Sequence, residues 1–132
     1  MLLRIVAQYA DMWNASAGAD RMRALIEVIA RHGERVRRDP AEVEKTVLMP
    51  LCYRAGPERE EFVCRVMASM RQTTPEQARR QSMIGQKQEC LDTVERYARA
   101  GVTHFIFMLF VPFFEDEIQA FAEEVIPAVR GA

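Results

Sequence analysis

The sequence predicts an α/β fold with about three parallel strands flanked by helices, on three observations. Residues 46–53 and 102–110 are apolar at almost every position, as is typical of strands covered on both faces. Segments with apolar residues at helical spacing precede and follow each of these strands. Strands that alternate with helices form parallel βα units. Because a parallel sheet of only three strands leaves unpaired edges, the pattern indicates part of a larger α/β structure.

The first elements follow from local signals. An amphipathic helix is expected over residues 2–10, and a short extended piece over residues 11–15. Asp20 is expected to be the N-cap of a long helix, because its carboxylate can accept hydrogen bonds from the first turn. Asp39-Pro40 begins another helical turn, since proline at the first helical position loses no hydrogen bond.

Later elements alternate in the same way. Pro50, within the strand at 46–53, predicts an irregular point or an unpaired amide there. Residues 83–85 are expected only to interrupt the helices around them. The remaining expected elements are a helix over 58–71, a helix from the capping box Thr74-Pro75-Glu76-Gln77, a helix over 87–100 ended by Gly101, and a last helix from 115 to Pro127.

Composition excludes several classes of function. The 132 residues carry 18 Lys plus Arg against 19 Asp plus Glu, a formal net charge of −1. Without excess positive charge, neither nucleic acid nor an anionic membrane surface is an expected partner. No segment approaches the ~20 apolar residues of a membrane span. The three cysteines form no CxxC pair and are expected to be reduced, buried thiols in a cytoplasmic protein.

Few side chains suggest catalysis. No Ser-His-Asp set, glycine-rich phosphate loop or metal-ligand spacing is visible, so no metal site is expected. His104 lies in a predicted buried strand, where a core histidine with one hydrogen bond is favoured over a catalytic one. Arg79-Arg80 is expected on the surface, and contact with a substrate anion is the alternative.

Trp13 and Asn14 are the best candidates for the rim of a pocket. They lie near the end of a short predicted strand, and the carboxyl ends of parallel strands carry the sites of α/β folds. The alternative is structural: Trp13 covers the core and Asn14 opens the turn that follows.

Four segments of the chain match the motifs of one family in order and approximate spacing: residues 3–14, Gly33 with 38–43, Ile84-Gly85 with 97–107, and 121–127. They resemble the luciferase-like monooxygenases, the bacterial-luciferase superfamily with its branch that uses the deazaflavin coenzyme F-420. Residues 3–14, LRIVAQYADMWN, resemble the family's “LrlvArYADgWN”, with Met12 where the family has glycine. Gly33 with residues 38–43 (RDPAEV) resembles the family's “GRDPaei”. Ile84-Gly85 with residues 97–107 (YARAGVTHFIF) resembles “iGtpeev…yaeaGvdhfil”. Residues 121–127 (FAEEVIP) resemble “faeeVlP”. Their order and approximate spacing agree across nearly the whole chain.

The resemblance implies a (β/α)₈ TIM-type barrel of which residues 1–132 are the C-terminal part, a single partial barrel domain with a variable helical insertion over 53–84. The family binds a reduced flavin or deazaflavin and transfers hydride or activates oxygen. Its glycine-rich phosphate turn would precede Leu2, and the groups near the cofactor ring come largely from earlier strands. No catalytic or cofactor-binding residue is therefore carried over to this chain.

The function implied is that of a C-terminal fragment of a flavin- or coenzyme F-420-dependent oxidoreductase or monooxygenase, inactive alone. Flavin mononucleotide or coenzyme F-420 would serve the complete enzyme on a small-molecule substrate, and neither is expected to bind this chain tightly. The alternative is a non-enzymatic α/β interaction module that forms a homodimer or complements another partial barrel. A weaker third interpretation is a small stand-alone α/β metalloprotein.

Overall fold

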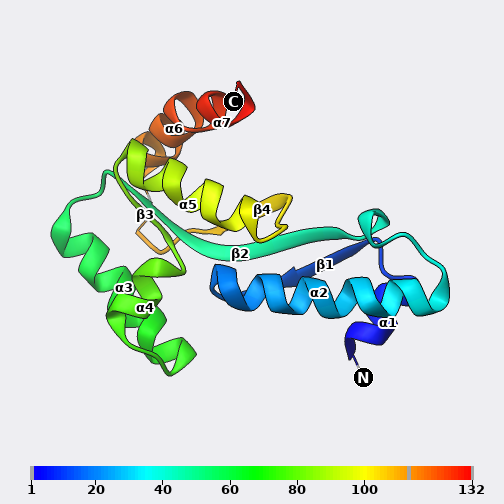
Figure 1. Ribbon diagram of the computed structural model, residues 1–132. Helices are drawn as coiled ribbons and strands as arrows, with labels where there is room; N and C mark the ends of the chain where they lie inside the picture. The colour runs from blue at the N-terminus through cyan, green and yellow to red at the C-terminus, as the bar shows by residue number, and fades with distance from the viewer. Residues whose placement is uncertain (1, 113, 132) are drawn as a thin grey trace. The chain divides into compact units, whose positions relative to one another are not determined.

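The computed structural model describes residues 2–112 and 114–131, in which strands alternate with helices (Figure 1). The elements in chain order are α1 (Leu2–Tyr9), β1 (Met12–Ala15), α2 (Ala19–Val36), the 3₁₀ helix η1 (Pro40–Glu42), β2 (Glu44–Tyr53), α3 (Pro57–Arg71), α4 (Pro75–Arg80), β3 (Met83–Gly85), α5 (Lys87–Arg99), β4 (His104–Met108), α6 (Glu115–Glu124) and α7 (Ile126–Arg130). The pairings of β1 and β3 with β2 are parallel, and β4 also pairs with β2. The predicted α/β class is confirmed.

The chain divides into two compact units. The first unit contains residues 1–48 and 96–106, and the second contains residues 49–95 and 107–132. The strands β2 and β4 and the helix α5 each contribute residues to both units.

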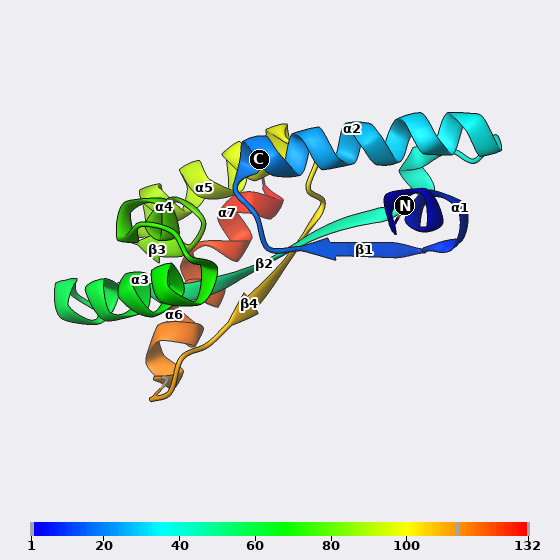
Figure 2. The ribbon, with the colours of Figure 1, turned by 90° about the horizontal axis from the view of Figure 1, so that it is seen from below.

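In the first unit, β1 pairs with the beginning of β2, from Met12 opposite Glu44 to Ala15 opposite Val47. Helix α1 packs against α2, and Figure 2 shows α2 lying along β1. The Tyr97 hydroxyl at the end of α5 donates a 2.9 Å hydrogen bond to the Ala17 carbonyl. This bond ties the turn before α2 to α5.

The N-cap prediction for α2 is wrong by two residues. The helix begins at Ala19, its N-cap is Gly18, and no side chain makes a capping hydrogen bond there. Asp20 instead lies inside the first turn, where its negative charge still complements the positive end of the helix dipole. The start at Asp39 is confirmed, because Asp39 Oδ1 accepts a 2.8 Å hydrogen bond from the Ala41 amide.

In the second unit, the end of β2 pairs with β3, from Leu51 opposite Met83 to Tyr53 opposite Gly85. Residues 83–85, expected only to interrupt the helices, therefore form a fourth strand. Helices α3 and α4 precede it, and the predicted capping box is confirmed by the 3.2 Å hydrogen bond from the Gln77 amide to Thr74 Oγ1. The buried residues around this strand are Cys52, Val63, Cys64, Met67, Ala68, Ala78 and Ile84.

Strand β4 is shorter and less covered than predicted. It spans His104–Met108, its apolar residues are only partly buried, and His104 is exposed. The prediction of a strand covered on both faces is therefore wrong, and so is that of a core histidine. An apolar run shows which side chains favour burial, but the elements packed on each face decide whether they reach it. His104 Nδ1 lies 3.1 Å from Glu44 Oε1 at the surface.

Pro50 lies between the segments of β2 that pair with β1 and with β3, and β2 continues through it over Glu44–Tyr53, so an irregular point at Pro50 stays a prediction. The prediction that Pro127 bends or ends the last helix is confirmed. The last helical segment breaks at Val125, and Pro127 lies in the first turn of α7. None of the helices in the described part of the chain is long and apolar enough to cross a membrane.

Candidate functional site

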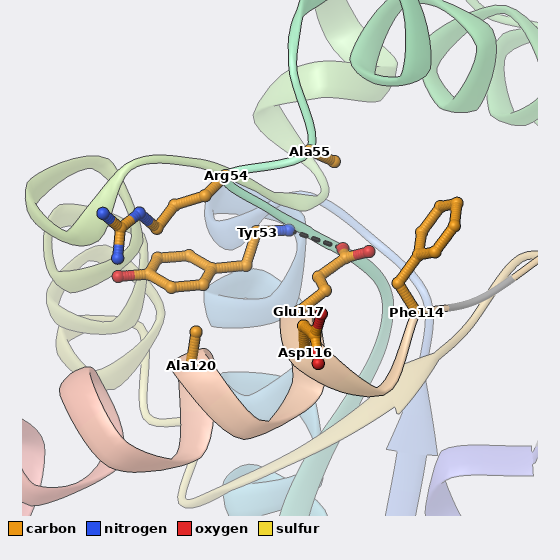
Figure 3. A pocket seen from close by; sticks show the side chains of 7 residues that line it. All are labelled: Tyr53, Arg54, Ala55, Phe114, Asp116, Glu117 and Ala120. Carbon is orange, nitrogen blue, oxygen red and sulfur yellow. Dashed lines mark hydrogen bonds between the residues drawn. The ribbon is translucent and has the colours of Figure 1, made fainter.

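A cavity of about 310 Å³ lies at the carboxyl end of β2, in the second unit (Figure 3). We call it the β2-end cavity. The carboxyl ends of parallel strands are where α/β folds build their sites. The lining residues come from the end of β2 and the beginning of α6, and they are Tyr53, Arg54, Ala55, Phe114, Asp116, Glu117 and Ala120.

The backbone turns sharply after β2. Arg54 has a left-handed φ of 54°, and its amide donates a 3.1 Å hydrogen bond to the Gly85 carbonyl of β3. Gly56 has a φ of 86°, a conformation that glycine adopts without a steric penalty, and α3 begins at Pro57. This turn holds Arg54 and Ala55 at the cavity wall.

Glu117 is the most buried charged group at the cavity, with a side chain only 7 % exposed. Its Oε1 accepts a 2.7 Å hydrogen bond from the Tyr53 amide, and Figure 3 shows the carboxylate pointing toward that nitrogen. Its Oε2 lies 3.6 Å from Nε of Arg59, within ion-pair distance but too far for a hydrogen bond.

Arg59 connects the surrounding segments. Its Nη2 donates a 3.1 Å hydrogen bond to the Phe110 carbonyl, and its guanidinium lies 5.0 Å from the centre of the Phe114 ring. Its Nε is buried without a hydrogen-bond partner among the residues described. Arg59 also lines a neighbouring cavity of about 480 Å³, together with Ala55, Glu58, Phe62, Val111, Pro112 and Phe114.

The Tyr53 hydroxyl forms a structural hydrogen bond with Glu124. It donates this 2.8 Å hydrogen bond to Glu124 Oε2, and Arg54 Nη1 lies 2.5 Å from the other oxygen of that carboxylate. Burial, and then the hydrogen bond to Glu124, raise the pKa of Tyr53. The phenol therefore stays protonated near neutral pH and does not act as a base.

The three thiols are buried, as predicted from their number and spacing. Burial, and then the charge of Glu117, raise the pKa of Cys52 to about 11. Burial, and then the charge of Glu89, raise the pKa of Cys90 to about 12. Burial also raises the pKa of Cys64, against the opposing charge of Arg79. Because the thiolate is the reactive form, these cysteines are poor nucleophiles.

Arg79 pairs with two carboxylates, Glu60 at 2.8 Å and Glu89 at 3.4 Å. The hydrogen bond to Glu60 is the main cause that raises its pKa. These pairs favour the surface interpretation of Arg79 over contact with a substrate anion. Within residues 2–112 and 114–131, no three His, Cys, Asp or Glu side chains come together as metal ligands would.

Trp13 and Asn14 lie in β1, in the first unit. Trp13 is 8 % exposed, and Asn14 is exposed. The Thr46 hydroxyl lies 2.8 Å from Asn14 Oδ1 and 3.2 Å from the Trp13 carbonyl oxygen. Met12, where the family has glycine, is half-exposed and does not crowd this strand. The pocket-rim role of Trp13 and Asn14 stays a prediction.

The residues that sequence reasoning missed are Arg59, Phe114 and Glu117. The sequence shows Glu117 only as one of three consecutive acids in a first helical turn, which the helix dipole already explains. One available signal was that these residues lie in the loop or the first helical turn that follows a predicted strand, near the edge where sites form.

No protein-family model matches the chain, and no curated relative matches its sequence. Solved structures do match its fold. A coenzyme F-420-dependent tetrahydromethanopterin reductase from Methanopyrus kandleri aligns with a TM-score of 0.72 at 14 % identity, over 96 % of this chain and 47 % of the reductase. A coenzyme F-420-dependent secondary alcohol dehydrogenase, in complex with an F-420–acetone adduct, aligns with a TM-score of 0.76 at 19 % identity, over 97 % of this chain and 46 % of the dehydrogenase.

A third match is the monooxygenase RslO1 from Streptomyces bottropensis, with a TM-score of 0.69 at 12 % identity over 96 % of this chain and 44 % of the monooxygenase. The chain spans under half the length of each of these three structures. The resemblance read from the sequence motifs is therefore confirmed at the level of fold. This chain has the fold of part of a luciferase-like TIM barrel.

Proposed function

We propose that this chain is the C-terminal portion of a luciferase-like oxidoreductase that uses a flavin or coenzyme F-420. The observation that carries the proposal is the alignment of 96–97 % of the chain with two F-420-dependent enzymes. The β2-end cavity supports it, because a cavity at the carboxyl ends of parallel strands suits the substrate side of a barrel enzyme. In the complete enzyme the cofactor would supply the redox chemistry.

The described residues do not fit the phosphate group of such a cofactor. Of the two cations at the cavities, Arg54 pairs with Glu124 and Arg59 pairs with Glu117. Asp116 and Glu58 also line the two cavities and form no ion pair with any residue in 2–112 or 114–131, so they add negative charge to the lining. A phosphate would meet net repulsion there, so we assign no cofactor-binding residue to this chain.

The same charges support the expectation that the chain alone is inactive. A TIM barrel of this kind has about 250 residues. The chain accounts for 46–47 % of the two F-420-dependent structures. We therefore propose that the rest of a barrel, on another polypeptide segment, supplies the phosphate site and most of the cofactor contacts.

The cofactor content of the chain in its native complex tests this proposal. Tagged chain is recovered from its own cells, and visible absorption shows whether flavin or deazaflavin is bound. We expect the cofactor only in fractions where further barrel sequence is present. If the isolated 132-residue chain carried one equivalent of cofactor, the expectation that the chain alone is inactive would be overturned. If a complete barrel contained neither cofactor, the proposed redox role would be overturned.

A second candidate function is the interaction module that forms a homodimer. Exposed apolar side chains on α1 favour it, with Leu2 and Tyr9 about 70 % exposed. Such side chains are typical of surfaces that another protein covers. Sedimentation of the purified chain over a range of concentrations tests this function. A concentration-independent monomer would exclude the homodimer.

A further inference from the structure

We propose that the cavity of about 480 Å³ beside Arg59 binds a small, neutral aromatic molecule that carries a hydrogen-bond acceptor oxygen, such as an aryl amide. We call it the Arg59 cavity, and all of its lining residues belong to the second unit. The oxygen would accept a hydrogen bond from Arg59, and the ring would lie against Phe62 and Phe114. As a substrate class, this ligand rests on the redox function proposed above, whereas its binding to this chain does not.

The unused donors of Arg59 carry this inference. A guanidinium has five N–H donors and no acceptor. Nη2 donates a 3.1 Å hydrogen bond to the Phe110 carbonyl, and Nε is buried without a hydrogen-bond partner among residues 2–112 and 114–131. Nη1 donates no hydrogen bond to these residues either, but unlike Nε it is not buried. A ligand oxygen would therefore find donors at this wall of the cavity that the described residues leave unused.

The surroundings of Arg59 hold its guanidinium in place before any ligand arrives. The side chain is 15 % exposed, Nε lies 3.6 Å from Glu117 Oε2, and the guanidinium carbon lies 5.0 Å from the centre of the Phe114 ring. A donor that is already fixed loses little conformational freedom on binding. A hydrogen bond from a charged donor is also stronger than one between neutral groups.

The charges at the cavity favour a neutral ligand. Glu117 compensates the charge of Arg59, and Glu58 lines the cavity without an ion pair to any residue in 2–112 or 114–131. An anion would meet the carboxylates of Glu58 and Glu117, which repel it. An organic cation would offer N–H donors to a guanidinium that itself can only donate. A neutral molecule with an acceptor oxygen avoids both conflicts.

The walls favour an aromatic ligand. Three large apolar side chains at this cavity are well exposed, namely Phe62 at 44 %, Val111 at 79 % and Phe114 at 53 %. Such side chains gathered around a cavity are typical of a surface that a ligand covers. Aromatic rings pack favourably against one another in offset or edge-on arrangements. The volume of about 480 Å³ lies within the usual range of small-molecule pockets.

Three molecules of nearly the same shape test the proposal on the purified chain: 2-naphthamide, 2-naphthamidinium and 2-naphthoate. Calorimetry measures their affinities, and chemical shifts of the Phe62 and Phe114 amides and of the Arg59 Nε–H group locate the site. We expect the neutral amide to bind about tenfold more tightly than the amidinium, which has no acceptor oxygen. We expect the carboxylate to bind at least about tenfold more weakly than the amide, because Glu58 and Glu117 repel it.

Each other result of this comparison counts against the proposal. An amidinium that bound as tightly as the amide would show that no acceptor is recognised. A carboxylate that bound most tightly would identify an anion site instead, and would contradict the statement that these residues do not fit a cofactor phosphate. Absence of binding by all three molecules would show that the Arg59 cavity takes no aromatic ligand of this kind.

A pair of variants on α3 assigns binding to the cavity. Phe62→Ala shortens an exposed side chain of the lining, so it should fold normally and weaken 2-naphthamide binding about fivefold. Met70→Ala is the matched control, because Met70 is 65 % exposed on the same helix and does not line the cavity. Its affinity should be unchanged. Equal losses in the two variants would show only general adsorption to apolar surface and would overturn the proposal.

Arg59→Lys tests the donor directly. The lysine keeps a positive charge beside Glu117 but loses the planar set of N–H groups. The preference for the amide over the amidinium should fall from about tenfold to about twofold. A folded Lys variant with the full preference would overturn the role of Arg59. Urea unfolding shows whether this variant folds, and if it does not, the three molecules and Phe62→Ala still decide the proposal.

The outcome is independent of the cofactor experiment. Amide binding to this chain, together with a complete barrel that contains neither cofactor, would leave the Arg59 cavity standing and remove the redox role. Cofactor in a complete barrel, without amide binding to this chain, would leave the redox role standing and remove the ligand site.

Discussion

The backbone amide of Tyr53 donates a 2.7 Å hydrogen bond to Oε1 of Glu117, a residue 64 positions later in the chain. This bond joins the last residue of β2 to the first turn of α6. The other oxygen of Glu117 faces Arg59 of α3. One carboxylate therefore connects three segments around the β2-end cavity, and its charge matters for stability.

The first prediction concerns that charge. Glu117→Gln keeps a carbonyl that can accept the Tyr53 amide but leaves Arg59, only 15 % exposed, without its counter-ion. We expect the free energy of unfolding to fall by about 3 kcal/mol, because removal of one partner leaves a buried charge uncompensated. Urea unfolding measures this change.

The matched control is the ion pair of Glu61 and Arg65, which are 3.7 Å apart and both mostly exposed. Glu61→Gln should change the free energy of unfolding by less than about 0.5 kcal/mol, since exposed pairs contribute little. Similar losses in the Glu61 and Glu117 variants would contradict the buried role of Glu117.

The Tyr53 hydroxyl leads to a second prediction. Tyr53→Phe removes the hydrogen bond to Glu124 and keeps the ring, which packs edge-on against Phe121 at 5.6 Å. We expect the free energy of unfolding to fall by about 1 kcal/mol, the usual contribution of one hydrogen bond. Tyr9→Phe, at an exposed position on α1, is the control and should show no change. Unchanged stability in Tyr53→Phe would mean that the hydroxyl bond contributes nothing.

The helices could be predicted because their signals are local. The Thr74 side chain caps α4 through the Gln77 amide, and Asp39 caps η1 through the Ala41 amide, as the sequence indicated. Strand β3 could not be predicted in this way. Three residues show no periodicity, and only the pairing of Met83–Gly85 with β2 makes them a strand. Local sequence signals do not indicate that pairing.

The candidate site was not predicted from the sequence. The β2-end cavity lies at the carboxyl end of a parallel strand, which is the kind of place where Trp13 and Asn14 were expected to act, but it lies at a different strand. Its key contacts were not predictable, because Glu117 meets Tyr53 across 64 residues of chain. Local rules explain an acid in a first helical turn equally well whether it is exposed, like Glu115, or buried, like Glu117.

Gly33 in α2 gives a third prediction. A Cβ atom at this position would lie 2.9 Å from the Arg38 carbonyl oxygen and 3.3 Å from the Pro40 ring. Alanine is intrinsically the better helix former by about 1 kcal/mol, but overpacking costs about 1–3 kcal/mol. We therefore expect Gly33→Ala to destabilise the chain in thermal unfolding. Glu34→Ala, at the exposed neighbouring position, should be neutral, and a gain in stability from Gly33→Ala would contradict the close contact.

The buried thiols predict how stability responds to alkaline pH. Cys52 and Cys90 have pKa values raised by burial to about 11 and about 12, from an ordinary value of 9.0 in the unfolded chain. Between these limits the unfolded chain has lost the thiol protons that the folded chain keeps. The free energy of unfolding therefore falls as the pH rises above 9, by at most about 1.4 kcal/mol per pH unit for each thiol.

Other groups also titrate in this range, so the test is a difference between two proteins. Each is unfolded with urea from pH 7 to pH 10.5, and each curve is referred to its own value at pH 7. Cys90→Ala loses one of the titrating thiols, so its stability should fall less steeply above pH 9 than that of the unmodified chain. Below pH 8 the two curves should run parallel, because both thiols are protonated in the folded and unfolded states alike. Curves that stay parallel to pH 10.5 would show that the Cys90 thiol titrates normally and is not held in the core.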